Sequence, residues 1–162
     1  MIEYFPIWIT NLFKIVPYES AHKEAFIALN KAWIEKYFKL ESVDLEIFEN
    51  LEIRILGQGG FIFCALADGK VVGVCAAVKL DDQKYGYELS KLSVDERYRG
   101  RGIGEALFRA CIAKAQSLSG KKIFLESNTK LKSAISLYRK FGFREVPIEK
   151  PLFDRVDIQM EL

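Results

Sequence analysis

Three glycines alternate with other residues near the middle of the chain, at Gly100, Gly102 and Gly104. Three arginines surround them with positive charge: Arg97, Arg99 and Arg101. Apolar residues recur at helical spacing directly afterwards, so the glycines precede a helix. The first N–H groups of a helix have no partner within it and carry the positive end of its dipole, and glycines let a ligand approach them closely. The pattern predicts a phosphate-binding turn.

The spacing of these glycines excludes two common phosphate-binding motifs. The nucleotide-binding pattern G-x-x-x-x-G-K-[ST] does not occur in the chain. The dinucleotide pattern G-x-G-x-x-G, begun at either of the first two glycines, would place its last glycine on Glu105 or Leu107. A nucleotide-dependent oxidoreductase is therefore disfavoured. The pattern that fits is [QR]-x-x-G-x-[GA], with Arg99, Gly102 and Gly104.

The composition indicates a globular chain with one core. Half of the 162 residues are hydrophobic, and the formal net charge is +2. This length suits a single domain over 1–162, and this charge is too small to indicate a nucleic-acid partner. No apolar run approaches the length of a membrane span, so no membrane partner is expected. Residues 1–11 form an apolar extension whose Glu3 and Pro6 argue against a signal peptide.

The cysteines and the single histidine restrict the chemistry further. Cys64, Cys75 and Cys111 lie in apolar runs without a CxxC pair, which predicts buried free thiols in a reducing compartment. We therefore expect the cytoplasm. His22 is the one histidine, near the start of an expected helix, so a histidine-based nucleophilic site or zinc site is disfavoured. No metal is expected.

The order of expected elements is hairpins first and strand–helix–strand units afterwards. The expected strands span residues 12–18, 61–67, 70–80, 87–94, 122–127, 143–146 and 156–162. The expected helices span residues 20–38, 43–54, 103–119 and 131–141, with Ser20 and Ser42 as N-caps of the first two. Asp68-Gly69 is a strong hairpin turn, and the strand at 122–127 follows a helix, which favours a parallel crossover. This order predicts an α/β (α+β) fold, a mixed sheet with helices on both faces.

Several strings extend the pattern beyond the glycine turn. They read E-L-x-K-L-x-V, Y-R-G-x-G-I-G and L-E-S-N-x-K-L-x-x-A-I-x-L-Y-x-K-x-G-F. From about residue 12 to residue 162 the chain resembles the GNAT superfamily of acyl-CoA N-acyltransferases. It is most similar to small bacterial stand-alone members that resemble the acetyltransferase half of proteins fused to a MarR-type regulator. The chain has no room for that regulator, so the resemblance adds no DNA partner.

The resemblance implies a mostly antiparallel sheet of about seven strands and acetyl-CoA as co-substrate, held at its pyrophosphate by the glycine turn. The implied turn residues are Arg99, Gly100, Arg101, Gly102, Ile103 and Gly104. The main chain of Leu92 and Val94 would pair with the pantetheine arm. Counting by twos along an extended strand places both on the same side as Glu88 and Ser90. Asn128 would bond the pantetheine amide or an ordered water, or is an ordinary turn residue.

Acetyl transfer to an amine also needs a base and benefits from an acid. Glu88 is the candidate base, because burial on an apolar strand raises the pKa of a carboxylate; it resembles the base of the histone-acetyltransferase branch. A structural role for Glu88 stays open, and Glu126 is the runner-up. Tyr138 lies in the last of the strings above, and the resemblance implies that its hydroxyl reaches the coenzyme sulfur. The alternative is a tyrosine anchored in the core.

The leading hypothesis is an acetyl-CoA-dependent N-acetyltransferase in which a primary amine of a small molecule or amino acid attacks directly in a ternary complex. The acceptor is expected between residues 37–42 and 147–155. Phe38, Phe153, Glu41 and Asp154 there suit a small cation, whereas Lys150 and Arg155 suit an amino-acid carboxylate. A protein lysine or N-terminus and a non-catalytic acyl-CoA sensor remain alternatives. The apolar extension could cover a sheet edge or form a homodimer contact.

Overall fold

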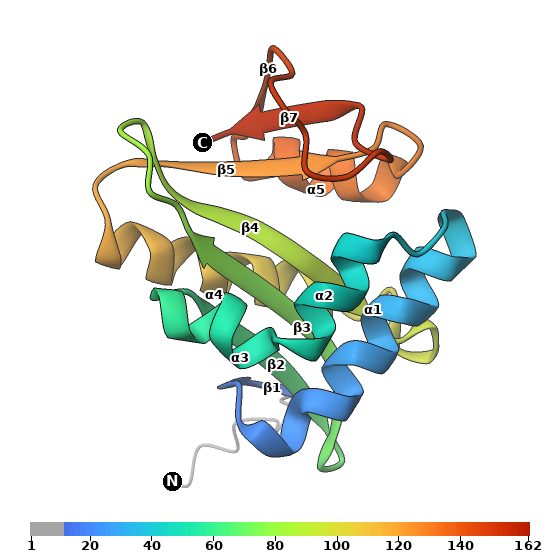
Figure 1. Ribbon diagram of the computed structural model, residues 1–162. Helices are drawn as coiled ribbons and strands as arrows, with labels where there is room; N and C mark the ends of the chain where they lie inside the picture. The colour runs from blue at the N-terminus through green and yellow to red at the C-terminus, as the bar shows by residue number, and fades with distance from the viewer. Residues whose placement is uncertain (1–11) are drawn as a thin grey trace, which may run out of the picture.

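A single seven-stranded sheet organises the chain in the computed structural model, which describes residues 12–162 (Figure 1). The strand order across the sheet is β1-β2-β3-β4-β5-β7-β6. The strands are β1 (Lys14–Pro17), β2 (Phe61–Ala67), β3 (Lys70–Lys79), β4 (Tyr85–Val94), β5 (Lys122–Ser127), β6 (Arg144–Val146) and β7 (Ile158–Glu161). Only β4 and β5 pair in parallel, whereas the other described pairs are antiparallel. The expected mixed, mostly antiparallel sheet is confirmed.

Helices cover both faces of the sheet and enclose two apolar clusters. The helices are α1 (Lys23–Tyr37), α2 (Ser42–Glu49), α3 (Leu51–Arg54), α4 (Ile103–Leu118) and α5 (Lys132–Lys140), with short 3-10 turns at Ser20–His22, Leu56–Gln58 and Glu96–Tyr98. The cluster on one face includes side chains of α1–α3, and the cluster on the other includes side chains of α4 and α5. α1 to α3 lie in front of the sheet and α4 behind it in Figure 1. The three cysteines are free and buried, as expected.

The strands β4 and β5 are paired along only part of their length. They pair from Tyr85–Lys122 to Leu89–Leu125, and the pairing ends there. Beyond that point the two ribbons diverge toward the side of α1 (Figure 1). The parallel crossover through α4 brings the carboxyl ends of both strands to this same opening. Residues that follow β4 and β5 in the sequence therefore meet there.

A β-bulge in β4 lies at this opening. Val74 of β3 pairs with Ser93 and Ala76 pairs with Ser90, so two residues of β4 face one of β3. Lys91 is one of the two, and its φ of 55° is a left-handed value that residues other than glycine rarely adopt. A bulge of this kind bends its strand and reverses the alternation of side chains beyond it.

The bulge overturns one expectation about the faces of β4. Glu88 pairs with Val78, which belongs to the cluster under α1–α3. Leu92 and Val94 pack instead against the cluster under α4 and α5. The prediction that Leu92 and Val94 share a side with Glu88 and Ser90 is wrong, because counting by twos assumes an uninterrupted strand.

The helix starts also differ slightly from expectation. Glu41, not Ser42, is the N-cap of α2, and its N–H donates to Asp44 Oδ2 at 2.9 Å. Glu19 stands in the same place before Ser20. The expected helix over 43–54 is divided at Asn50 into α2 and α3.

Two expectations concern features that the fold does not test. The apolar extension at 1–11 lies outside the described residues. Among residues 12–162, none of the helices combines the length and apolar character needed to cross a bilayer. The expected cytoplasmic location stays a prediction.

Candidate active site

The glycine turn has the backbone geometry of an open cradle. Gly100 has φ 73° and Gly102 φ 80°, and Gly102 is the N-cap of α4. A Cβ built on either glycine meets no heavy atom within 4 Å, so both face open space. Ile103 and Gly104 open the first turn of α4, where N–H groups have no partner within the helix. The chain thus presents main-chain donors and the positive end of α4 to one place.

This turn forms one end of a groove with an empty volume of about 1450 Å³. Of the residues that the sequence proposed for coenzyme binding, the groove is lined by Leu92, Val94, Arg99, Gly100, Gly102, Ile103 and Gly104. Arg101 is not among its lining residues, and its guanidinium carbon lies 5.0 Å from the centre of the Tyr98 ring. Most residues of the glycine turn therefore line the groove, whereas Arg101 does not.

Two lysines that the sequence analysis missed, Lys130 and Lys132, also line this groove. Lys130 Nζ donates to the Tyr37 carbonyl at 3.1 Å, and Arg99 Nη1 lies 3.4 Å from the Tyr37 hydroxyl. Both cations are thus held near the end of α1. The signal that could have found the lysines is the parallel crossover, because it places the segment after β5 at the same edge of the sheet as the glycine turn.

A second, more enclosed cavity adjoins the groove, with an empty volume of about 790 Å³. Trp33, Leu92, Leu131 and Tyr138 line both spaces, so the two meet at these side chains. The cavity is also lined by Asn30, Ile34, Phe38, Cys75, Glu88, Leu89, Ser90, Lys91, Phe108, Glu126, Ser127, Asn128, Phe153, Arg155 and Val156. A ligand lying in the groove and another lying in the cavity could therefore meet at Tyr138.

Glu88 of β4 and Glu126 of β5 both face this cavity. Burial and, after it, the charge of Glu126 raise the pKa of Glu88 to about 7, and Lys91 opposes the rise. A carboxylate whose pKa lies near neutrality can accept a proton and release it again at neutral pH. Glu126 accepts a hydrogen bond from Gln159 Nε2 at 2.9 Å.

Tyr138 of α5 is fixed by aromatic packing, with its ring centre 5.2 Å from that of Phe108 and 6.4 Å from that of Phe143. Burial and, after it, the interaction with Cys75 raise the pKa of its hydroxyl to about 12, and a hydrogen bond with Ser127 opposes the rise. The phenol therefore stays protonated at neutral pH and can act as a proton donor. Tyr138 packs against the apolar core and also lines both the groove and the cavity. A core tyrosine and a tyrosine that reaches the coenzyme sulfur are therefore compatible interpretations.

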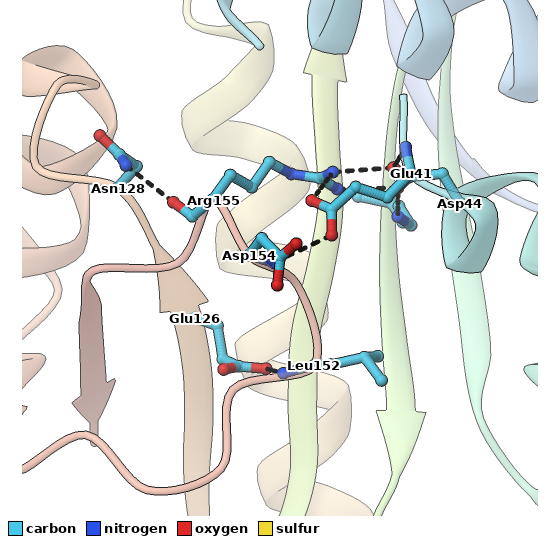
Figure 2. Close-up of polar contacts among 8 residues, drawn as sticks. Glu41, Asp44, Glu126, Asn128, Leu152, Asp154 and Arg155 are labelled. Atoms are coloured by element: carbon cyan, nitrogen blue, oxygen red, sulfur yellow. Dashed lines mark hydrogen bonds and ion pairs between the residues drawn. The ribbon is translucent and has the colours of Figure 1, made fainter. Parts of the chain in front are cut away.

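Asn128 lines the cavity rather than the groove. Its Nδ2 donates to the Arg155 carbonyl at 2.7 Å, and its Oδ1 accepts from the Lys130 N–H at 2.8 Å. Figure 2 shows the first of these bonds, which ties the end of β5 to the loop before β7. These contacts are those of a turn residue, and binding of the pantetheine amide by Asn128 stays a hypothesis.

A buried cluster of charges lies beside the cavity, which Lys91 and Arg155 line. Figure 2 shows Arg155 with Asp44 and Glu41. Asp44 of α2 is 0% exposed and Lys91 is 6% exposed, with Lys91 Nζ 3.1 Å from Asp44 Oδ1. Arg155 donates to both oxygens of Asp44 at 2.7 Å and to Glu41 Oε2 at 3.0 Å. Burial raises the pKa of Asp44, but hydrogen bonds from Arg155 and from the Glu41 N–H outweigh it, and the pKa lies below its usual range. Burial lowers the pKa of Lys91, and Asp44 partly opposes this.

The loops expected to bound the acceptor do reach the cavity, through Phe38, Phe153 and Arg155. Glu41 and Asp154 do not line it. Instead, the Asp154 N–H donates to Glu41 Oε1 at 2.9 Å, which joins the two loops. Lys150 is not among the lining residues either.

Comparison with known proteins shows the family of this chain. A profile described as "Acetyltransferase (GNAT) family" matches residues 21–143. A GNAT-family acetyltransferase of Staphylococcus aureus Mu50 has a TM-score of 0.81 at 26% identity, covering 92% of this chain and 97% of that one. The chain therefore belongs to the acetyltransferase (GNAT) family, which confirms the resemblance seen in its sequence.

Curated relatives and one further structure complete the comparison. N-acetylaspartate synthetase of Rattus norvegicus is 34% identical over 115 residues, 71% of this chain and 36% of the relative. N-acetyltransferase 8B of Mus musculus is 34% identical over 91 residues, 54% and 39% of the two chains. The chain thus spans well under half the length of both. A phosphinothricin acetyltransferase of Sinorhizobium meliloti in complex with AcCoA shares the fold, with a TM-score of 0.75 and 18% identity over 93% of this chain and 88% of that one.

Replacing Asp44 by asparagine tests the buried cluster. We expect Asp44→Asn to lower the free energy of unfolding by about 3–5 kcal/mol, because Lys91 and Arg155 lose a buried counter-charge. Urea unfolding followed by circular dichroism measures this. Glu46→Gln is the control on the same helix, since Glu46 is exposed and contacts Arg54 only at 3.5 Å. A loss for Asp44→Asn no larger than that of the control would show that the cluster is not stabilising.

Proposed function

We propose that this chain is an acetyl-CoA-dependent N-acetyltransferase that transfers acetyl to a primary amine by direct attack in a ternary complex. The observation that carries the proposal is the junction at Tyr138. There a groove that begins at the start of α4 meets a cavity that contains Glu88, a carboxylate with a pKa near neutrality. A site with a proton acceptor, a proton donor and two adjoining spaces suits transfer between two bound substrates.

The groove fits the diphosphate and the arm of acetyl-CoA, which would supply a thioester-activated acetyl group. Gly100 and Gly102 leave space for phosphate oxygens beside the main chain, and Arg99, Lys130 and Lys132 provide positive charge. The segment of β4 beyond Leu89 no longer pairs with β5. Its main-chain groups at Leu92 and Val94 are therefore suited to receive an extended arm as an added strand.

Glu88 is suited to be the base. An alkyl ammonium has a pKa near 10 and must lose a proton before its nitrogen can attack. Glu88 lies on the α1–α3 face of β4, whereas Leu92 and Val94 lie on the opposite face. The base and the acetyl-positioning strand segment are thus separated by the bulge, with the cavity between α1 and β5 available for the acceptor.

Tyr138 is suited to be the acid. Its hydroxyl keeps its proton to a pH of about 12, so it can give that proton to the leaving thiolate, and Ser127 and Asn128 line the cavity beside it. No cysteine is needed as a nucleophile: burial raises the pKa of Cys64 to about 12, and the pKa of Cys75 is also well above its usual value, through its interaction with Cys111 and burial.

The acceptor is a primary amine of a small molecule or an amino acid in this proposal. The cavity is enclosed on one side by the loop before β7, which suits a small acceptor better than a folded protein. One relative is named for synthesis of N-acetylaspartate, which makes an acidic amino acid the alternative acceptor to test.

A release assay tests the proposed function. The protein is mixed with acetyl-CoA and with separate amines, amino acids, aminoglycosides and lysine peptides, and free coenzyme A thiol is measured. We expect release that depends on one class of small primary amine. Calorimetric binding of acetyl-CoA without release for any acceptor would favour the non-catalytic sensor, and absence of binding would remove the proposal.

Removing the Tyr138 hydroxyl tests the acid. We expect Tyr138→Phe to lower kcat about a hundredfold or more, the typical contribution of a positioned general acid. The affinity for acetyl-CoA should stay within about twofold, because the phenylalanine ring keeps its packing against Phe108. Steady-state kinetics and calorimetry measure the two quantities. An unchanged kcat would assign Tyr138 to the core alone.

Neutralising Glu88 tests the base through the pH dependence of the rate. In the unaltered protein, kcat/KM should rise with pH through about 7, because Glu88 must be deprotonated to accept a proton. Glu88→Gln should remove this limb and lower kcat/KM by about 10²–10⁴-fold, while the rise near pH 10 from the amine itself remains. A limb near pH 7 that survives the substitution would contradict the assignment.

A further inference from the structure

We propose that the cavity beside Tyr138 selects an acceptor with two ammonium groups, a short aliphatic diamine, and that Glu126 is the residue that binds the second ammonium. The inference rests on the proposed acetyltransferase function and names its acceptor class. It follows from the charges that face the cavity and from those that are already paired.

The cations at the cavity are already neutralised. Arg155 donates to both oxygens of Asp44 at 2.7 Å and to Glu41 at 3.0 Å (Figure 2). Lys91 Nζ lies 3.1 Å from Asp44 Oδ1. The faces of the Phe153 ring receive the same two cations, with Lys91 Nζ 4.7 Å and the Arg155 guanidinium carbon 4.2 Å from its centre. An acceptor carboxylate would have to break this buried cluster to find a partner. The cavity is therefore unsuited to an acidic acceptor.

The carboxylates of Glu88 and Glu126 are not neutralised in this way. Within residues 12–162, neither has an ion-pair partner. The donors to Glu126 in the described part of the chain are uncharged, Gln159 Nε2 at 2.9 Å and the Leu152 N–H at 3.5 Å. Each carboxylate oxygen can accept more than one hydrogen bond. The cavity thus carries uncompensated negative charge, which favours cations.

The two carboxylates lie on one face of the sheet. Glu88 pairs with Phe124 in the parallel register, and Glu126 is two residues further along β5. Successive side chains of a strand alternate, so Phe124 and Glu126 point to the same side, and Glu126 is a diagonal neighbour of Glu88. Two separate anionic points on one wall match the two ends of a diamine.

The rest of the cavity wall suits the carbon chain between those ends. Apolar surface comes from α1, from the turn after it, and from the loops that precede α5 and β7: Trp33, Phe38, Leu131 and Val156. A methylene chain gains free energy by leaving water for such a surface. An amine with a polar or anionic body would gain less.

The roles of the two carboxylates then divide. The attacking ammonium gives one proton to Glu88, and its nitrogen then forms the amide bond to the acetyl carbon. The carbon–sulfur bond breaks, the thiolate takes the proton of Tyr138, and the second proton that the nitrogen loses returns to the Tyr138 oxygen. Glu126 holds the distant ammonium, which does not react. The product is a monoacetylated diamine with one remaining positive charge.

Matched acceptors test the selection without any substitution. Butylamine and 1,4-diaminobutane have the same carbon chain and differ in the second ammonium. We expect kcat/KM for the diamine to exceed that for butylamine about ten- to a hundredfold, as a charge-assisted hydrogen bond implies, and L-aspartate to be a poor acceptor. Equal values for the two amines, or a preference for aspartate, would overturn the inference while leaving the acetyltransferase intact. If none of the acceptors gave thiol release, the proposed function itself would fail.

Glu126→Gln then tests the residue. We expect KM for 1,4-diaminobutane to rise about ten- to a hundredfold. The change for butylamine should be smaller, because it arises only from the effect of the Glu126 charge on the pKa of Glu88. Glu145→Gln, an exposed carboxylate of β6, is the control and should leave both amines unaffected. Glutamine keeps an oxygen for the bond from Gln159, and a thermal melt checks the fold. Equal losses for both amines would indicate a merely structural Glu126, and no change for either would exclude it from acceptor binding.

Discussion

The parting of β4 and β5 is the constraint on which the rest of the site depends. Parallel strands that stay paired would satisfy their own main-chain groups and leave no room between them. Here pairing ends at Leu89, a bulge at Lys91 turns β4 away, and the opening lies where α4 and α5 begin. The buried pair of Lys91 with Asp44 holds the strained bulge residue in place. A groove and a cavity follow from that one departure from sheet geometry.

Buried carboxylates on the two sides of this opening have pKa values shifted in opposite directions. At Asp44, Arg155 and Glu41, burial encloses charges that satisfy one another, which fixes the loop before β7 against the start of α2. At Glu88 it encloses a carboxylate that has no such partner among residues 12–162, and the pKa rises to about 7. Both carboxylates are buried, and they differ in whether charged hydrogen-bond partners surround them. A paired buried carboxylate stays ionised and stabilises the fold, whereas an unpaired one has a raised pKa and can exchange a proton near neutral pH.

Much of the site was predictable because its signals are local. The glycines of the turn, the apolar runs of β2 and β3 and the apolar stripe of α4 each act through neighbours in the sequence, and these predictions agree with the structure. The misplaced features depend on distant contacts. Nothing near Lys91 in the sequence announces a bulge, so Leu92 and Val94 were assigned to the wrong face. The approach of Lys130 to the groove depends on the crossover through α4.

The sequence by itself determined the order of elements, the glycine turn at the start of α4 and the membership of a family, since periodicity and motif spacing are properties of the chain alone. Only the tertiary structure decided which charges remain free. Arg155 is separated from Asp44 by 111 residues, and their pairing removes the cation that could have bound an acidic acceptor. That outcome depends on the loop before β7 meeting the start of α2, and no spacing within either segment encodes it.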